Sequence, residues 1–152
     1  MIGQLSLQDP DIVQQIWRLQ HMAFRLEASM LGLRHTPVLP ETFDSLSASS
    51  EAFYGEISED GDLLGAIAVT EEQPGNMMIT RLMVELSHLR QGIGSRLLEH
   101  VLIHNPHIQR FSVYAGTLNT PAVELYRKFG FIPVGARTVD YGVELTLMQR
   151  EM

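Results

Sequence analysis

The sequence contains no cysteine among its 152 residues. This absence excludes disulfide bonds, thiolate metal sites and a cysteine nucleophile. No apolar run approaches the roughly 20 residues that a membrane-spanning helix requires, so we expect no membrane partner. The N-terminal residues also lack a basic segment followed by an apolar stretch, the pattern of a secretory signal. We therefore expect a cytoplasmic protein.

Clustered positive charge is missing as well. The formal net charge is −7, with 11 Lys and Arg against 18 Asp and Glu. Residues 1–76 hold 12 acidic and 3 basic residues, whereas residues 77–152 hold 6 acidic and 8 basic ones. Nucleic-acid binding requires basic clusters that neutralise phosphates, so we expect no nucleic-acid partner. The second half has enough basic residues to receive a small anionic cofactor, although a solvated surface explains the same charges.

The chain has no internal repeat, low-complexity tract or linker, and its length is typical of one compact domain. We therefore expect a single domain over residues 1–152. Its first helix has Asp9 and Pro10 as N-terminal signals and a stripe of apolar residues at helical spacing. This stripe consists of Ile12, Ile16, Leu19, Ala23, Leu26 and Met30.

The remaining pattern predicts an α/β fold. Strands are expected at about 3–7, 52–57, 63–70, 77–84, 111–115, 131–138 and 143–149. Helices are expected at about 9–32, 41–49, 92–104 and 120–129, with a proline-containing loop at 35–40. The strand–helix–strand unit over 77–115 predicts one parallel pair. We expect a mixed, mostly antiparallel twisted sheet of about seven strands with helices on both faces.

A glycine-containing turn, Leu89-Arg90-Gln91-Gly92-Ile93-Gly94-Ser95, lies between a strand and an amphipathic helix. Such a turn lets backbone N–H groups converge on an anion, and the helix N-terminus adds positive potential. A dinucleotide-binding turn would need a third glycine where Leu97 stands and an acidic residue where Tyr114 stands. A nucleotide P-loop would need Gly-Lys-Ser/Thr, which is absent.

Two segments resemble signatures of the GCN5-related N-acetyltransferase (GNAT) superfamily. Leu82-Met83-Val84 followed eight positions later by Gly92 is similar to the family's strand end and cofactor loop, Arg/Gln-x-x-Gly-x-Gly/Ala. Leu89 departs from this pattern at its first position. The second segment is Asn119-x-x-Ala122-x-x-Leu125-Tyr126-x-Lys128-x-Gly130-Phe131. The resemblance extends from about Glu51 to the C-terminus.

The resemblance implies an N-acetyltransferase that transfers an acetyl group from acetyl-CoA to an amine by direct attack, with no metal. It implies a small-molecule or peptide acceptor, leaves a homodimer open, and makes Tyr126 the general acid. Phosphates would be bound by N–H groups of Gln91, Gly92, Gly94, Ser95 and Arg96. The implied cofactor-binding residues are Leu82, Met83, Val84, Arg90, Gln91, Gly92, Ile93, Gly94, Ser95, Arg96, Asn119 and Tyr126.

The general base stays open, because residues 77–84 contain no acid and have only Thr80 and Arg81 as polar side chains. Deprotonating a lysine-like amine at pH 7 costs about 4–5 kcal/mol, so a base or a water chain is expected. Candidate bases are Glu27, Glu41 and Glu56, each of which has a structural or solvated alternative. Further proton carriers are His21, His35 and His88, none at metal-ligand spacing.

Two other groups of residues have functional and structural interpretations. The first group either lines an acceptor cavity or belongs to the ordinary core, and it consists of Trp17, Met22, Met30, Met77, Met78 and Met83. Arg127 and Lys128 either approach the cofactor phosphates or form a solvated helix face. Two alternative functions are a catalytically inactive acyl-CoA-binding sensor or interaction domain, and a nucleotide-binding oxidoreductase.

Overall fold

The computed structural model describes residues 1–30, 42–139 and 142–152, and at Met30 it describes the backbone alone. Several predictions lie outside the described residues. They are the end of the first helix near Gly32, the loop at 35–40, His35 as a proton carrier, Glu41 as a base, and the side chain of Met30 as part of a stripe or cavity.

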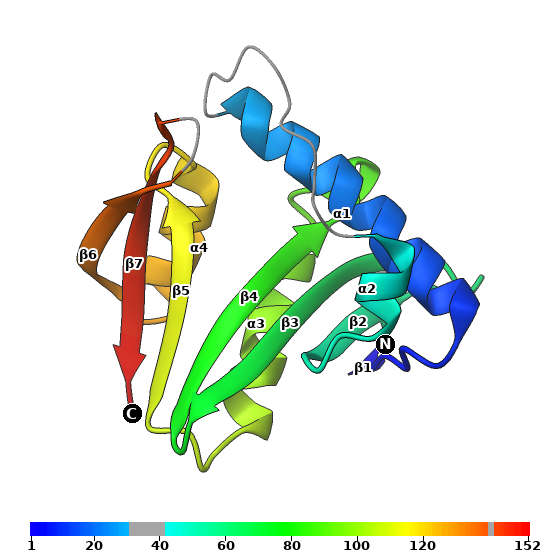
Figure 1. Ribbon diagram of the computed structural model, residues 1–152, viewed down its shortest axis with the longest axis horizontal. Coiled ribbons are helices and arrows are strands. Elements are labelled where there is room, and N and C mark those ends of the chain that lie inside the picture. The colour runs from blue at the N-terminus through cyan, green and yellow to red at the C-terminus, as the bar shows by residue number, and fades with distance from the viewer. Residues whose placement is uncertain (31–41, 140–141) are drawn as a thin grey trace.

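Within the described residues, seven strands form one sheet in the order β1-β2-β3-β4-β5-β7-β6 (Figure 1). All neighbouring strands are antiparallel except β4 and β5, which are parallel. The strands are β1 (Ile2–Gln4), β2 (Ala52–Ile57), β3 (Leu63–Gln73), β4 (Asn76–Val84), β5 (Arg110–Gly116), β6 (Ile132–Thr138) and β7 (Glu144–Glu151). The predicted mixed sheet and its parallel pair are confirmed.

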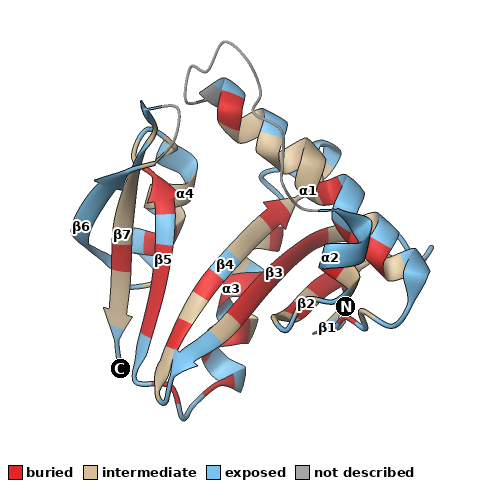
Figure 2. Ribbon diagram, viewed as in Figure 1, coloured by how far each residue is buried: buried red, intermediate tan, exposed pale blue. Residues whose placement is uncertain are grey.

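Helices cover both faces of the sheet, as predicted. They are α1 (Pro10–Met30), α2 (Phe43–Ser47), α3 (Ile93–His104) and α4 (Thr120–Lys128), and a 3-10 turn, η1, spans Leu86–His88. Helices α1 and α2 contribute to one hydrophobic core against the sheet, and α3 and α4 contribute to the other. Figure 2 shows β3 and β5 largely buried between these layers, whereas the edge strand β6 is exposed.

Helix α1 buries a slightly different stripe from the predicted one. Val13, Ile16, Leu19 and Ala28 are buried, whereas Ile12 and Ala23 pack only partly against the core. The reason is visible in Figure 1, where α1 crosses the sheet obliquely and its C-terminal part extends past the tip of β4. The C-terminal half of α1 instead faces the cavity described below, with Phe24 and Glu27 in its lining.

The two parallel strands separate along their length. Their pairing runs from Asn76 opposite Arg110 to Ile79 opposite Val113, and β4 then has a bulge at Thr80. The Thr80 hydroxyl donates a hydrogen bond to the Ala68 carbonyl (3.1 Å). Bulges bend a strand and increase its twist. Beyond the bulge β4 and β5 diverge, and this leaves one edge of β4 unpaired among the described strands (Figure 1).

Candidate functional site

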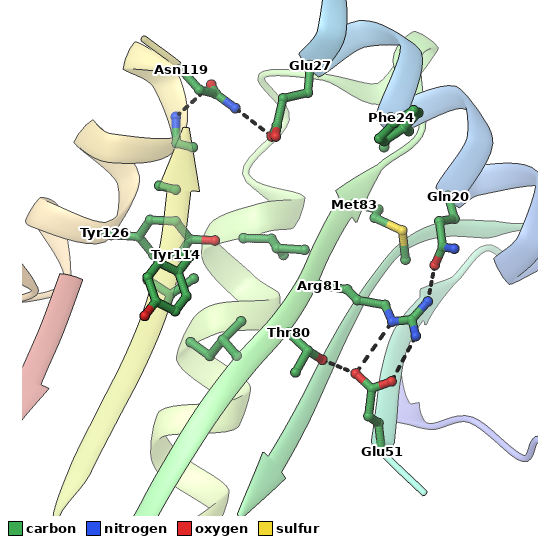
Figure 3. Close-up of a pocket in the computed structure, with 16 residues that line it drawn as sticks. Gln20, Phe24, Glu27, Glu51, Thr80, Arg81, Met83, Tyr114, Asn119 and Tyr126 are labelled. Carbon is green, nitrogen blue, oxygen red and sulfur yellow. Dashed lines mark hydrogen bonds and ion pairs between the residues drawn. The ribbon is translucent and has the colours of Figure 1, made fainter. Parts of the chain in front are cut away.

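A cavity of about 450 Å³ opens where β4 and β5 diverge. Its walls come from α1, β4, β5, α4 and the residue before β2 (Figure 3). The lining residues are Gln20, Ala23, Phe24, Glu27, Glu51, Ile79, Thr80, Arg81, Leu82, Met83, Val113, Tyr114, Ala115, Asn119, Ala122 and Tyr126. The cavity thus brings the two sequence signatures together, although about 40 residues of chain separate Leu82 from Asn119.

Tyr126 reaches this cavity from α4. The residue is 5% exposed, and its ring packs against Phe131 with 5.6 Å between ring centroids. Its hydroxyl points into the space between β4 and β5 (Figure 3), and no hydrogen bond joins it to another described residue. Burial, and then the negative charge of Glu27, raises the pKa of Tyr126. The phenol therefore stays neutral and keeps a proton that it can donate into the cavity.

Glu27 from α1 and Asn119 at the start of α4 line the same end of the cavity (Figure 3). The Asn119 side chain caps α4 by accepting from the Ala122 N–H (3.4 Å), and its Nδ2 donates to Glu27 Oε2 (3.1 Å). Within the described part of the chain, Glu27 has no cationic partner. Its carboxylate is therefore held by a neutral amide beside the cavity.

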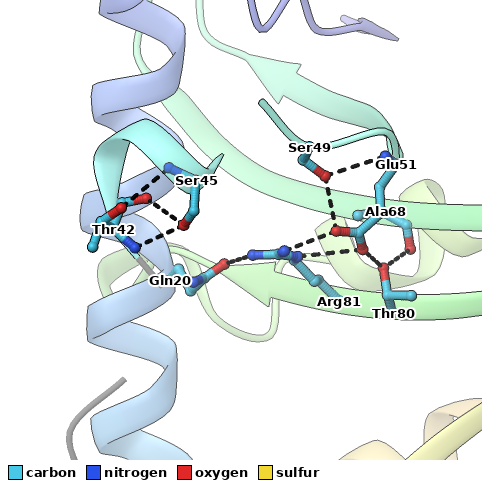
Figure 4. A network of polar contacts seen from close by, with 8 residues as sticks. All are labelled: Gln20, Thr42, Ser45, Ser49, Glu51, Ala68, Thr80 and Arg81. Atoms are coloured by element: carbon cyan, nitrogen blue, oxygen red, sulfur yellow. Dashed lines mark hydrogen bonds and ion pairs between the residues drawn. The ribbon is translucent and has the colours of Figure 1, made fainter. Parts of the chain in front are cut away.

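A second carboxylate in the cavity, Glu51, belongs to a polar network (Figure 4). Arg81 donates to Glu51 Oε2 (2.8 Å) and to Gln20, while the Thr80 hydroxyl also donates to Glu51. Burial would raise the pKa of Glu51, but hydrogen bonds from Arg81, Thr80 and Ser49 outweigh it and lower the pKa. Glu51 is thus a paired, ionised carboxylate. Sequence reasoning missed it, because its partners lie about 30 residues away and no motif links them.

The glycine turn next to this cavity adopts an unusual backbone. Arg90 and Gly92 both have left-handed φ angles, 64° and 80°. Gly92 is the N-cap of α3, and no side chain in the described residues caps this helix end. The N–H of Arg96 donates to the Gly92 carbonyl (3.0 Å) and so closes the first helical turn. This N–H is therefore used within the helix, contrary to its predicted role in binding phosphates. The N–H groups of Ile93, Gly94 and Ser95 precede it in the first turn, where an α-helix offers no intrahelical acceptor.

The other predicted cofactor residues lie along the cavity, at the end of β4 and at the start of α3. Leu82 and Met83 line the cavity, and Val84 ends β4. Ile93 is 2% exposed, so its side chain belongs to the core and only its backbone faces the turn. Gly94 has room for a Cβ atom, which would lie 3.5 Å from Leu125 Cδ2 and 3.9 Å from Val84 Cγ2.

Several other candidates do not reach the cavity. Glu56 is paired with Arg96, and His88 contacts Glu85 (3.2 Å) on the exposed 3-10 turn. His21 stacks edge-on against Trp17. Glu56 and the two histidines are therefore not positioned to act as bases there.

Among the predicted lining residues whose side chains the structure describes, Met83 alone lines this cavity. Trp17 and Met22 line a separate cavity of about 650 Å³ between α1 and Leu86, because they lie on another face of α1 from Glu27. Met77 is part of the core, and Met78 lies on β4 outside the cavity lining. Arg127 and Lys128 are exposed in the last turn of α4 and do not line the cavity.

The geometry agrees with a match to known proteins. Residues 13–131 match the model of the Acetyltransferase (GNAT) family. The chain belongs to this family. It is also 34% identical over 131 residues to UPF0157 protein YqkA of Bacillus subtilis (strain 168). That match covers 86% of this chain but only 38% of the relative.

Solved GNAT structures share the fold. An N-acetyltransferase from Staphylococcus aureus Mu50 superposes with a TM-score of 0.77 at 18% identity, covering 99% of this chain and 97% of that one. A GNAT family acetyltransferase from Elizabethkingia anophelis with acetyl-CoA bound superposes with a TM-score of 0.63 at 18% identity, covering 78% and 95%. In the described part of this GNAT chain, no helix has the length and hydropathy needed to cross a bilayer.

Proposed function

We propose that this GNAT chain transfers an acetyl group from acetyl-CoA to the amine of a cationic small molecule or peptide by direct attack. One observation carries the proposal. The Tyr126 hydroxyl and the Glu27 carboxylate lie at the same cavity, which opens onto the unpaired edge of β4 (Figure 3). A proton donor and a proton acceptor are the two groups that amine acetylation by a thioester requires.

The proposed cofactor site uses two backbone features. The pantetheine arm would pair with the free edge of β4 at Leu82–Val84, as an added strand does. The phosphates would bind the N–H groups at the uncapped start of α3, where the helix dipole favours negative charge. A structure of the same fold from Elizabethkingia anophelis has acetyl-CoA bound, which supports acetyl-CoA as the ligand.

Tyr126 is the proposed general acid. Attack by the amine nitrogen forms the new carbon–nitrogen bond and breaks the carbon–sulfur bond. The Tyr126 phenol gives its proton to the departing sulfur, and the proton released from the acylated nitrogen restores the phenol through solvent. The raised pKa of Tyr126 keeps the phenol protonated at neutral pH. Because no described residue already accepts a hydrogen bond from this hydroxyl, it is free to turn toward the sulfur.

Glu27 is the proposed partner of the acceptor amine. Glu51 is neutralised by Arg81, and Glu56 is neutralised by Arg96 away from the cavity. Glu27, by contrast, is held by the neutral Asn119 side chain. Its carboxylate is placed to attract an ammonium group and to accept its proton, which offsets part of the roughly 4–5 kcal/mol cost of deprotonation.

The test is thiol release from acetyl-CoA with a panel of amines that includes a polyamine, an aminoglycoside, amino acids and lysine-containing peptides. We expect release with cationic amines and a loss of about 10²-fold or more in kcat/KM for Glu27→Gln. Glu124→Gln, an exposed carboxylate on α4, is the matched control. CoA binding without thiol release for any amine would instead favour an acyl-CoA-binding sensor.

A further inference from the structure

The ion pair between Glu56 on β2 and Arg96 on α3 is bidentate. Arg96 Nε and Nη2 each donate to one Glu56 carboxylate oxygen, both at 2.8 Å. The third nitrogen, Nη1, donates to the Gln91 carbonyl at 3.0 Å. The Glu56 side chain is 12% exposed and that of Arg96 48%, so the pair lies partly shielded from solvent. One guanidinium therefore joins the sheet to the turn that precedes its own helix.

The turn held in this way has an unusual backbone conformation. Gln91 lies between two residues with left-handed φ angles, Arg90 (64°) and Gly92 (80°), and the first of these is not a glycine. Non-glycine residues adopt this conformation at an energetic cost that surrounding contacts must offset. The Arg96 guanidinium also packs against the turn, since a Cβ atom built on Gly92 would lie 3.2 Å from Nη1. The contacts of Arg96 thus converge on the backbone proposed to receive the phosphates.

We propose that Glu56 and Arg96 form a brace that holds the Gln91–Gly92 backbone in the conformation required to bind the CoA phosphates. Glu56 is then a positioning residue, because it orients the guanidinium that in turn fixes the Gln91 carbonyl. The inference rests on the proposed acetyl-CoA function and deepens it. The brace strengthens binding by ordering the turn before the ligand arrives, which reduces the conformational entropy lost on binding.

Electrostatics alone predicts that removing the Glu56 charge strengthens CoA binding, whereas a brace predicts that it weakens CoA binding. Removing a negative charge near the turn would favour an anionic ligand, and it would also release Arg96 to contact a phosphate directly. On that basis Glu56→Gln would tighten CoA binding, and Arg96→Lys, which keeps the charge, would leave it nearly unchanged. A brace instead predicts weaker binding in both variants, because Gln loses the charged acceptor and Lys cannot make three hydrogen bonds in the planar arrangement of Arg.

Calorimetric titration of the whole chain tests the brace with two ligands, CoA and pantetheine, the latter lacking the phosphates. The proteins are the wild type, Glu56→Gln, Arg96→Lys and the control Glu151→Gln, which removes charge from the Arg110–Glu151 ion pair on β5 and β7. We expect CoA affinity to fall about tenfold in Glu56→Gln and Arg96→Lys and to stay unchanged in Glu151→Gln. Pantetheine affinity should be unchanged in all four proteins. In turnover assays of Glu56→Gln and Arg96→Lys, the KM for acetyl-CoA should rise while kcat stays nearly constant.

Circular dichroism establishes which variants are folded, and Arg96→Lys provides a charge-conserving substitution at a half-exposed position if Glu56→Gln does not fold. Equal or tighter CoA binding by a folded brace variant overturns the proposal. An equal loss of pantetheine and CoA affinity also overturns it, because the pair would then support the whole site instead of the phosphate turn. A wild-type protein that does not bind CoA at all refutes the proposed function itself.

Discussion

The most informative substitution is Tyr126→Phe, because it removes one oxygen atom and preserves the ring. The ring contact with Phe131 remains, and no described residue loses a hydrogen-bond partner. We therefore expect the free energy of unfolding to change by less than about 1 kcal/mol, in the range of substitutions that remove no buried interaction. Any large change in activity is then attributable to the missing hydroxyl.

The expected loss in rate follows from the proposed role of the hydroxyl. General acid catalysis contributes about 10²–10⁴-fold, so the lower bound of 10² corresponds to about 2.7 kcal/mol of transition-state stabilisation. The raised pKa of Tyr126 means that the phenol should remain protonated up to and beyond its ordinary value near pH 10. We therefore expect no alkaline loss of activity from this residue below about pH 10.

Single-turnover thiol release with saturating acetyl-CoA measures this effect, because it separates chemistry from product release. Calorimetry on the same variant should give a CoA affinity within a few-fold of wild type, about 1 kcal/mol or less. If Tyr126→Phe retains near-normal single-turnover rates, Tyr126 is a core residue and another group protonates the thiolate. A variant that loses CoA affinity in proportion to its rate would equally contradict an acid role.

Three further predictions concern the turn, the acceptor and pH. Gly94→Val should weaken CoA binding well over tenfold in a folded protein by obstructing the approach of phosphates, and unchanged calorimetric affinity would falsify this. The kcat/KM for a cationic acceptor should fall as salt rises, and a screen in which only neutral or anionic acceptors react would refute this preference. Arg96 hydrogen bonds hold the pKa of Glu56 below its ordinary 4.5, so this pair stabilises the fold above that pH and loses its contribution as pH falls through the lower folded value. Urea denaturation should accordingly show a shallower acid-side loss of stability in Glu56→Gln, and identical pH profiles would contradict it.

Much of the fold could be predicted because its signals are local. The apolar run over 63–70 and the glycine turn before 93–104 each act within a few residues. Strand boundaries were accordingly close, with β4 predicted at 77–84 and found at Asn76–Val84. The first strand was displaced, from 3–7 to Ile2–Gln4, because Leu5 and Leu7 turn toward the core beneath α1 after the strand has ended.

The general base illustrates what local signals leave open. Glu27, Glu51 and Glu56 are indistinguishable as carboxylates in the sequence, yet they have different partners in the fold. Arg81 pairs with Glu51, and Arg96 pairs with Glu56, across separations of 30 and 40 residues. These pairings depend on strand register and on where α3 begins, and neither quantity is encoded in a short motif.

By itself the sequence determined the family, the sheet with helices on both faces, and the positions of the glycine turn and Tyr126. These features could be predicted because motifs and periodicity depend on residues that are close together in the chain. Only the tertiary structure decided that β4 and β5 diverge at the Thr80 bulge, that Tyr126 and Glu27 share the resulting cavity, and that Glu56 braces the turn through Arg96. The physical reason is that charge compensation and cavity shape arise from contacts between residues far apart in sequence. Such contacts exist only once the sheet register and the helix positions are established.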